Sequence, residues 1–242
     1  MISKQKNNNP ESRIPNPESR GFIRFICIAA TLVCLLMLPA CQPAMQRYGH
    51  LVSELRDNVY VAESANYSVQ IITGKREDPF LMDGHAGATR DFTVITVTPK
   101  IGEHTFTYRV TLNGTEYAGT FLPHPFAATV SADIAVLSSD TAIEVSISAG
   151  GKSEALTAQS VKTEQMISAD KAVEIAERKL KSCLDNFRAD GALHCEIYVR
   201  LMANPIDNSG GYYWYVAFIG ENQAIYAVLI DPVSMAVAAI RD

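Results

Sequence analysis

The spacing of apolar residues changes twice along this chain, and each change limits what a segment can fold into. Between about residues 67 and 161 apolar residues recur at every second position, and turn-forming pairs such as Asn113-Gly114 and Gly150-Gly151 interrupt the runs. A period of two is typical of strands with one buried face. From Ile167 the period lengthens to that of a helix, and after Asp190-Gly191 it returns to two. The pattern therefore predicts strands, then a helix, then a second set of strands.

About seven short strands are expected in the first of these regions, at Tyr67–Ile72, Phe92–Thr98, His104–Leu112, Thr115–Leu122, Ala127–Ala132, Ala142–Ser148 and near Glu154–Val161. Asn113-Gly114 accepts the positive φ angles of a type I′ turn, which places Leu112 opposite Thr115 and Val110 opposite Tyr117. Strands of this number and spacing resemble those of immunoglobulin-like or fibronectin-like domains. We therefore expect residues 63–162 to form a β-sandwich of the immunoglobulin-like type.

Residues 163–242 predict a small α+β domain. Ser168 suits a helix N-cap and Asp170 suits the first turn, at the head of an amphipathic helix of about 16 residues. Strands with alternating apolar residues follow at Leu193–Leu201, Tyr212–Ile219, Ala224–Ile230 and Met235–Ile240. One helix on about four antiparallel strands makes a compact two-layer unit.

Two segments of this domain, Ser168–Ala176 and Tyr226–Val237, resemble the PepSY domain, a module of secreted and membrane-attached bacterial proteins. The family pattern has glycine where this chain has Met235. Glycine there would permit a left-handed backbone, which costs methionine roughly 1 kcal/mol unless the turn differs. The resemblance implies a role in inhibiting or chaperoning peptidases, and it brings no catalytic residues.

The first forty residues read as an export signal. A basic polar stretch precedes the apolar run Phe25–Leu38, and Leu38-Pro39-Ala40-Cys41 resembles the lipobox of bacterial lipoproteins. The resemblance implies cleavage before Cys41 and lipid attachment to its thiol, which would hold the chain to the outer face of the cytoplasmic membrane or to the outer membrane. The alternative is an uncleaved anchor from Phe22 to Ala40. Both interpretations place residues 42–242 outside the cytosol.

The segment 41–62 is expected to be a lipidated N-terminus with a short helical tether. Apolar residues fall at helical spacing from Ala44 to about Asp57. The charges of this stretch are of both signs, which favours packing on the next domain over a basic helix on the membrane surface.

Charge and motif content argue against several function classes. After the leader, 16 Lys and Arg face 24 Asp and Glu, no cluster of basic residues is visible along the sequence, and no nucleic acid is expected as a partner. The five histidines have no metal-ligand spacing, and no nucleophile motif or phosphate loop is present. We therefore expect the protein to bind no metal and no cofactor and to have no catalytic activity. Among the alternatives for its function, a hydrolase has the least support.

Cys183 and Cys195 are the two cysteines beyond the lipobox, and the helical and strand periods place both on the core side. A disulfide between them would stabilise the fold by about 3 kcal/mol in the chain-entropy model. The alternative is two buried free thiols.

The aromatic run around Trp214 gives the candidate partner surface. Alternation places Tyr213 and Tyr215 on the face away from the helix, where exposed tyrosines would anchor a partner. The alternative is that the sandwich domain buries this face. The sequence thus predicts a non-catalytic, membrane-anchored envelope protein that binds a protein or peptide, or alternatively a modulator of a secreted peptidase.

Overall fold

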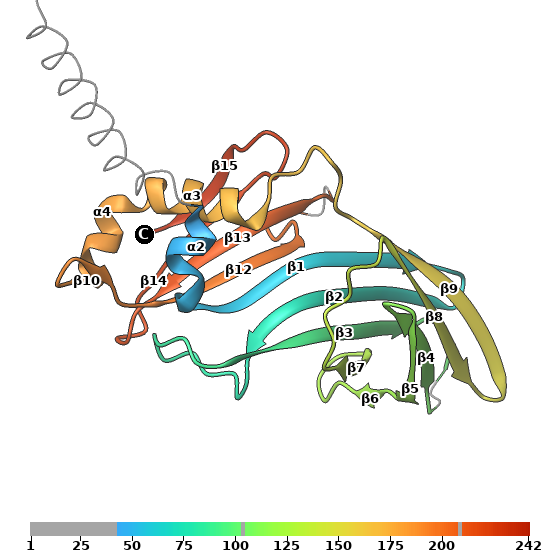
Figure 1. The fold of residues 1–242 in the computed structure, drawn as a ribbon. Coiled ribbons are helices and arrows are strands. Elements are labelled where there is room, and N and C mark those ends of the chain that lie inside the picture. The colour runs from blue at the N-terminus through green and yellow to red at the C-terminus, as the bar shows by residue number, and fades with distance from the viewer. Residues whose placement is uncertain (1–42, 103–104, 208–209) are drawn as a thin grey trace, which may run out of the picture. The chain divides into compact units, whose positions relative to one another are not determined.

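The computed structural model describes residues 43–102, 105–207 and 210–242 (Figure 1). Cys41 and the export signal lie outside these residues, as does His104. Pro43–Asp242 form one compact unit, built mainly of strands with a few short helices. The expectation of a β-rich fold is therefore confirmed.

Nine strands form a continuous path through the main sheet, in the order β15-β14-β13-β12-β1-β2-β3-β7-β6. Their bounds are β1 Val52–Glu63, β2 Tyr67–Glu77, β3 Thr89–Pro99, β6 Leu122–Pro123, β7 Val130–Ile134, β12 Glu196–Ala203, β13 Tyr212–Ile219, β14 Ile225–Ile230 and β15 Val237–Arg241. A branch leaves the far end of β1 and consists of β4 Thr107–Leu112, β5 Thr115–Thr120, β8 Ala142–Ala149 and β9 Lys152–Ser160. A separate small hairpin pairs β10 Arg188–Ala189 with β11 Ala192–Leu193.

Strand β1 connects the two regions that the sequence divided between residues 162 and 163. It pairs in antiparallel fashion with β2 and in parallel fashion with β12. The expected helix to about Asp57 is wrong: helix α2 covers Ala44–Tyr48, a 3-10 turn covers Gly49–Leu51, and the strand begins at Val52. The helical spacing of Leu51 and Leu55 was misleading because backbone pairing with β2 and β12, which the stretch itself does not reveal, holds this segment extended.

The hairpin at Asn113-Gly114 has the expected register. Leu112 lies opposite Thr115 and Val110 opposite Tyr117. Asn113 and Gly114 have φ angles of 49° and 77°, as a type I′ turn requires.

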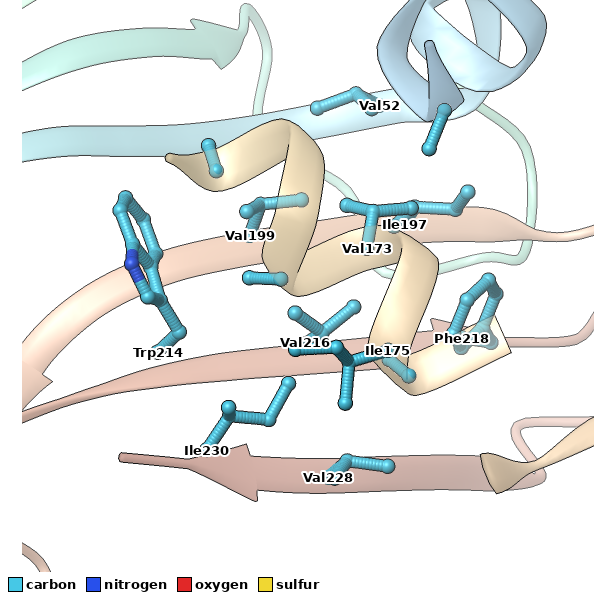
Figure 2. Close-up of a cluster of buried hydrophobic side chains, with 14 of the residues drawn as sticks. Val52, Val173, Ile175, Ile197, Val199, Trp214, Val216, Phe218, Val228 and Ile230 are labelled. Atoms are coloured by element: carbon cyan, nitrogen blue, oxygen red, sulfur yellow. The ribbon is translucent and has the colours of Figure 1, made fainter. Parts of the chain in front are cut away.

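Two hydrophobic clusters lie at opposite ends of the main sheet. One gathers side chains of β1, β2, β3 and β7 together with side chains of the branch strands β4, β8 and β9. The other, the helix core, lies between helices α2 and α3 and strands β12, β13 and β14, and it contains Trp214, Phe218 and Ile197 (Figure 2). The Trp214 indole Nε1 donates a 2.9 Å hydrogen bond to the carbonyl of Ile167, which satisfies the only polar atom of that side chain.

Helix α3 spans Ala169–Lys179 and begins as expected, because the Ser168 side chain accepts a hydrogen bond from the Lys171 amide. It is shorter than the predicted 16 residues. The chain continues as α4 at Lys181–Leu184 and as a 3-10 turn at Asp185–Phe187. The apolar residues of all three pieces still reach one core, which explains why the sequence read as one stripe.

Candidate functional site

The outer face of the C-terminal sheet, away from α3, carries the most unusual chemistry of the described chain. Glu196, Tyr198 and Arg200 alternate on β12 with the inward residues of the helix core. Alternation along β12 points Glu196 and Tyr198 away from the helix core, yet both are buried, at 0% and 3% exposure. The loop 78–88, between β2 and β3, reaches this face and is the reason for their burial.

Glu196 holds the loop through its two carboxylate oxygens. The hydroxyl of Ser53 donates to Oε2 at 2.7 Å, and the backbone N–H of Gly84 donates to Oε1 at 3.2 Å. Gly84 has a φ angle of +87°, and a Cβ there would lie 2.3 Å from the Glu221 amide nitrogen. Only glycine therefore lets the loop come close enough to reach the carboxylate.

Tyr198 lies beside Glu196 on the same face. Its ring packs on that of Phe80, with centroids 5.7 Å apart, and the Arg200 guanidinium lies 4.4 Å from its centroid. The hydroxyl is buried without a hydrogen-bond partner among the described residues. Burial, followed by the nearby charge of Glu196, raises the pKa of the Tyr198 phenol, so the side chain is neutral at physiological pH.

The loop also presents apolar side chains to solvent. Phe80, Leu81 and Met82 are 48%, 51% and 47% exposed. Three consecutive half-exposed apolar residues are unusual on a surface unless something covers them. The sequence signal for them is this apolar triplet between Pro79 and Gly84, which the sequence analysis did not single out.

Tyr213 and Tyr215 are both partly buried rather than fully exposed. Tyr215 packs against a small cluster that contains Tyr198 and Ala217. It also lines an open, largely apolar groove of about 190 Å³ together with Pro205, Ile206, Ala227, Val228, Leu229, Ala239, Ile240 and Arg241. Larger hollows exist near β4 and β8, but polar residues such as Thr107, Ser146 and Ser148 form much of their lining.

Arginines from four neighbouring strands meet on the same sheet. Arg200 of β12 lies opposite Arg56 of β1, and Arg76 of β2 lies opposite Arg90 of β3. Glu54 of β1 lies opposite Arg76 in the pairing of β1 with β2. These four arginines are far apart in the chain, so no basic cluster is visible along the sequence. The fold nevertheless brings them together on one sheet.

Carboxylates neutralise most of this arginine row. Glu54 is 3% exposed and accepts hydrogen bonds from Arg56, at 2.8 Å, and from Arg200. Asp133 binds Arg76 and Arg90 in the same way. The four arginines thus fall into two groups of shared ion pairs, one around Glu54 and one around Asp133, and little unpaired charge is left to attract a polyanion.

Cys183 and Cys195 both border the helix core, as expected, and both are free thiols in the structure. Cys195 is 2% exposed, whereas Cys183 is partly exposed. Burial raises the pKa of the Cys195 thiol to about 12, and the Glu196 charge adds to the effect.

No group of three or more His, Cys, Asp or Glu side chains that could hold a metal occurs in the part of the chain that the structure describes. His85 approaches Glu221 at 3.5 Å, but both side chains are well exposed. Within residues 43–102, 105–207 and 210–242, no helix is long and apolar enough to cross a bilayer.

Comparison with known proteins returned no matching family model, no similar curated protein and no similar solved structure.

Proposed function

We propose that this protein is a membrane-anchored extracytoplasmic lipoprotein without catalytic activity, which binds a protein or peptide of the cell envelope at the outer face of its C-terminal sheet. Lipid on Cys41 would hold it to the membrane. The sequence support is the apolar run that ends in Leu38-Pro39-Ala40-Cys41. The structural support is the apolar surface on the face that carries Tyr215.

The observation that carries the binding proposal is the groove at Tyr215. Its lining is largely apolar, and Ile206, at its rim, is 56% exposed. Phe80, beside Tyr198, adds half-exposed apolar surface on the same face. Open apolar surface is costly in water, and contiguous patches of this kind commonly mark sites where another protein docks.

Peptide selection against the purified lipidated protein tests the binding proposal. We expect selected peptides to contain apolar or aromatic side chains, because the groove offers few polar groups. Tyr215→Ser should weaken their binding by tenfold or more, since a buried aromatic anchor dominates such interfaces. Isothermal titration calorimetry measures the change.

Phe126→Ser is the matched control. Phe126 is 94% exposed and lies in the β6–β7 turn, outside the groove. Its loss should leave the affinity unchanged. Equal weakening by both substitutions, or none by Tyr215→Ser, would count against the groove as the binding site.

Lipid attachment has its own test. Cells that express the chain with labelled palmitate should yield labelled protein, and Cys41→Ser should abolish the label. Fractionation should then place the unsubstituted protein with membranes. Unlabelled protein among soluble cytosolic contents would remove both the lipoprotein and the envelope location.

A second candidate function is modulation of a secreted peptidase. Its support is the PepSY-like segments Ser168–Ala176 and Tyr226–Val237, which correspond to the start of α3 and to β14 with the turn that follows it. These elements pack together in the helix core. Secreted peptidases of the source cell should lose or gain activity when the protein is added, and the absence of any effect would remove this candidate.

The finer architecture of residues 63–162 is also a proposal. An immunoglobulin-like sandwich is supported by the cluster that joins β2, β3 and β7 with β4, β8 and β9. Tyr60 and Ala158 show that β1 and β9 contribute to the same core. An experimental structure of this region would test the strand order.

A further inference from the structure

The described chain is fixed to the fold from its first residues. Ala44 is 2% exposed, and the Met45 backbone N–H donates a 2.7 Å hydrogen bond to Oδ1 of Asp170 in the first turn of α3. Arg47 and Tyr48 both bind the Glu177 carboxylate farther along the same helix. Helix α2 is therefore packed on α3, and the chain contacts the fold from Ala44 onward.

If Cys41 carries lipid, which rests on the proposed function, this docking leaves a very short tether. Cys41 precedes Ala44 by three residues. A fully extended chain of that length spans at most about 11 Å. The headgroup layer on each side of a bilayer is about 5–7 Å thick, so the start of α2 and the first turn of α3 must lie at the membrane surface.

The turn between β14 and β15 lies beside the start of α3. The Ile167 backbone N–H, just before the Ser168 cap of α3, donates a 2.7 Å hydrogen bond to the carbonyl of Pro232. Val233 and Met235 follow in the turn and are 50% and 48% exposed. Two apolar side chains thus protrude next to the residues that the tether holds at the surface.

The conformation of this turn is rigid and strained. Oδ1 of Asp231 accepts hydrogen bonds from the backbone N–H groups of Val233 and Ser234, at 2.9 and 2.8 Å. Met235 has a φ angle of +62°, a left-handed conformation that favours glycine. Exposing the apolar side chain of Met235 to water is unfavourable. The same flexible side chain would be accommodated well at the boundary between lipid headgroups and acyl chains.

We propose that Val233 and Met235 insert into the interfacial layer of the phospholipid bilayer to which the lipid on Cys41 attaches the protein. The lipid supplies the attachment. The turn supplies a second, weaker contact that sets the orientation, with the α2–α3 side facing the bilayer. One lipid group alone would leave the protein free to rotate about its tether.

A fluorescence experiment on the full lipidated protein in vesicles tests the insertion. The Met235→Cys variant, made in a Cys183→Ser background, is labelled with an environment-sensitive dye, and the vesicles contain lipids with a quencher near the headgroup. Cys195 remains unlabelled because it is buried. We expect quenching at position 235 to be at least threefold stronger than for the same dye at Glu116→Cys, an exposed position on β5.

Val233→Cys serves as the second labelled position, in case the left-handed backbone at 235 does not tolerate the dye. Equal quenching at 233, 235 and 116, or its absence at both 233 and 235, would overturn the orientation. Palmitate labelling of the same samples separates the two proposals. Labelled protein without quenching refutes only the insertion, whereas unlabelled protein refutes the lipoprotein and the insertion with it.

Discussion

The Ser53 hydroxyl donates a 2.7 Å hydrogen bond to the Glu196 carboxylate, and both residues are completely buried. The same carboxylate accepts the Gly84 amide of the loop 78–88. A bulge in the pairing of β1 with β12 lies between Val52 and Glu54, at Ser53. Glu196 therefore connects the bulge at Ser53 with the loop 78–88, which covers Tyr198.

Replacing Glu196 should detach this loop. Glu196→Ala leaves the Ser53 hydroxyl and the Gly84 amide unpaired, which should lower the free energy of unfolding by about 3 kcal/mol. Glu196→Gln keeps an acceptor and should cost less. Urea unfolding measures the stability, and amide hydrogen exchange at Gly84 measures the loop. Exposed Glu144→Ala on β8 is the control and should change stability by under about 0.5 kcal/mol.

Gly74 on β2 should tolerate no side chain. A Cβ there would lie 1.8 Å from the Leu55 carbonyl oxygen, which is backbone and cannot swing aside. We expect Gly74→Ala to destabilise the fold by roughly 3 kcal/mol or more, as for other overpacked or strained sites. Gly49→Ala is the matched control, since a Cβ at that residue would meet nothing within 4 Å and its φ is −58°. If Gly74→Ala lowered the free energy of unfolding as little as Gly49→Ala does, the close approach of β1 and β2 would be contradicted.

Met235 should be replaceable by glycine with a gain in stability. Its φ of +62° is strained for any residue with a Cβ. Met235→Gly should therefore raise the free energy of unfolding by about 1 kcal/mol, since the strain it removes is of that size. Thermal unfolding without lipid measures this change. Exposed Val233→Gly, two residues earlier, should bring no such gain, and equal effects would refute the strain.

The two cysteines should differ sharply in reactivity. With its thiol pKa raised to about 12 by burial, Cys195 has almost no thiolate at pH 8, whereas Cys183 is partly exposed. Alkylation of the native protein should therefore modify Cys183 first, and modification of Cys195 should require unfolding. Mass spectrometry counts the alkyl groups. Two unreactive cysteines that become reactive only after reduction would instead establish the disulfide.

Asp231 should make stability depend on pH in the acidic range. Hydrogen bonds from the backbone N–H groups of Ser234 and Val233 lower the pKa of its carboxyl below the ordinary 3.8. Its stabilising contribution is complete above that value and is lost as the pH falls through the lower folded pKa. Asp231→Ala should thus destabilise the protein at pH 7 more than at pH 2. A destabilisation that is independent of pH would contradict the charge-assisted turn.

Local patterns predicted local structure well. Asn113-Gly114 fixed a hairpin register because both residues accept positive φ, and Ser168 marked the start of α3 because a side-chain oxygen caps free amides. The apolar residues that alternate along β12 all contribute to the helix core, as their period predicts, because burial of one face of a strand selects one register.

Contacts between distant segments could not be predicted in this way. The period of residues 44–57 suggested a helix, because nothing in that stretch shows that β2 and β12 will flank it. The burial of Glu196 could not be predicted from alternation, since the loop that covers it lies more than a hundred residues earlier. Tyr215 was placed on the correct face, but the groove beside it requires Ile206 and Leu229, which alternation alone does not bring together.

The position of β1 between β2 and β12 has a consequence for how the chain acquires its structure. Strand β1, the first strand of the described residues, forms its parallel ladder only when Tyr198 reaches Glu54, so most of the polypeptide must be present before β12 and the strands beyond it join the sheet. Pairing over such sequence distances is slow, because the entropy of a long loop is lost before any contact compensates for it. During synthesis, β1, β2 and β3 can therefore pair with one another long before the C-terminal strands are made.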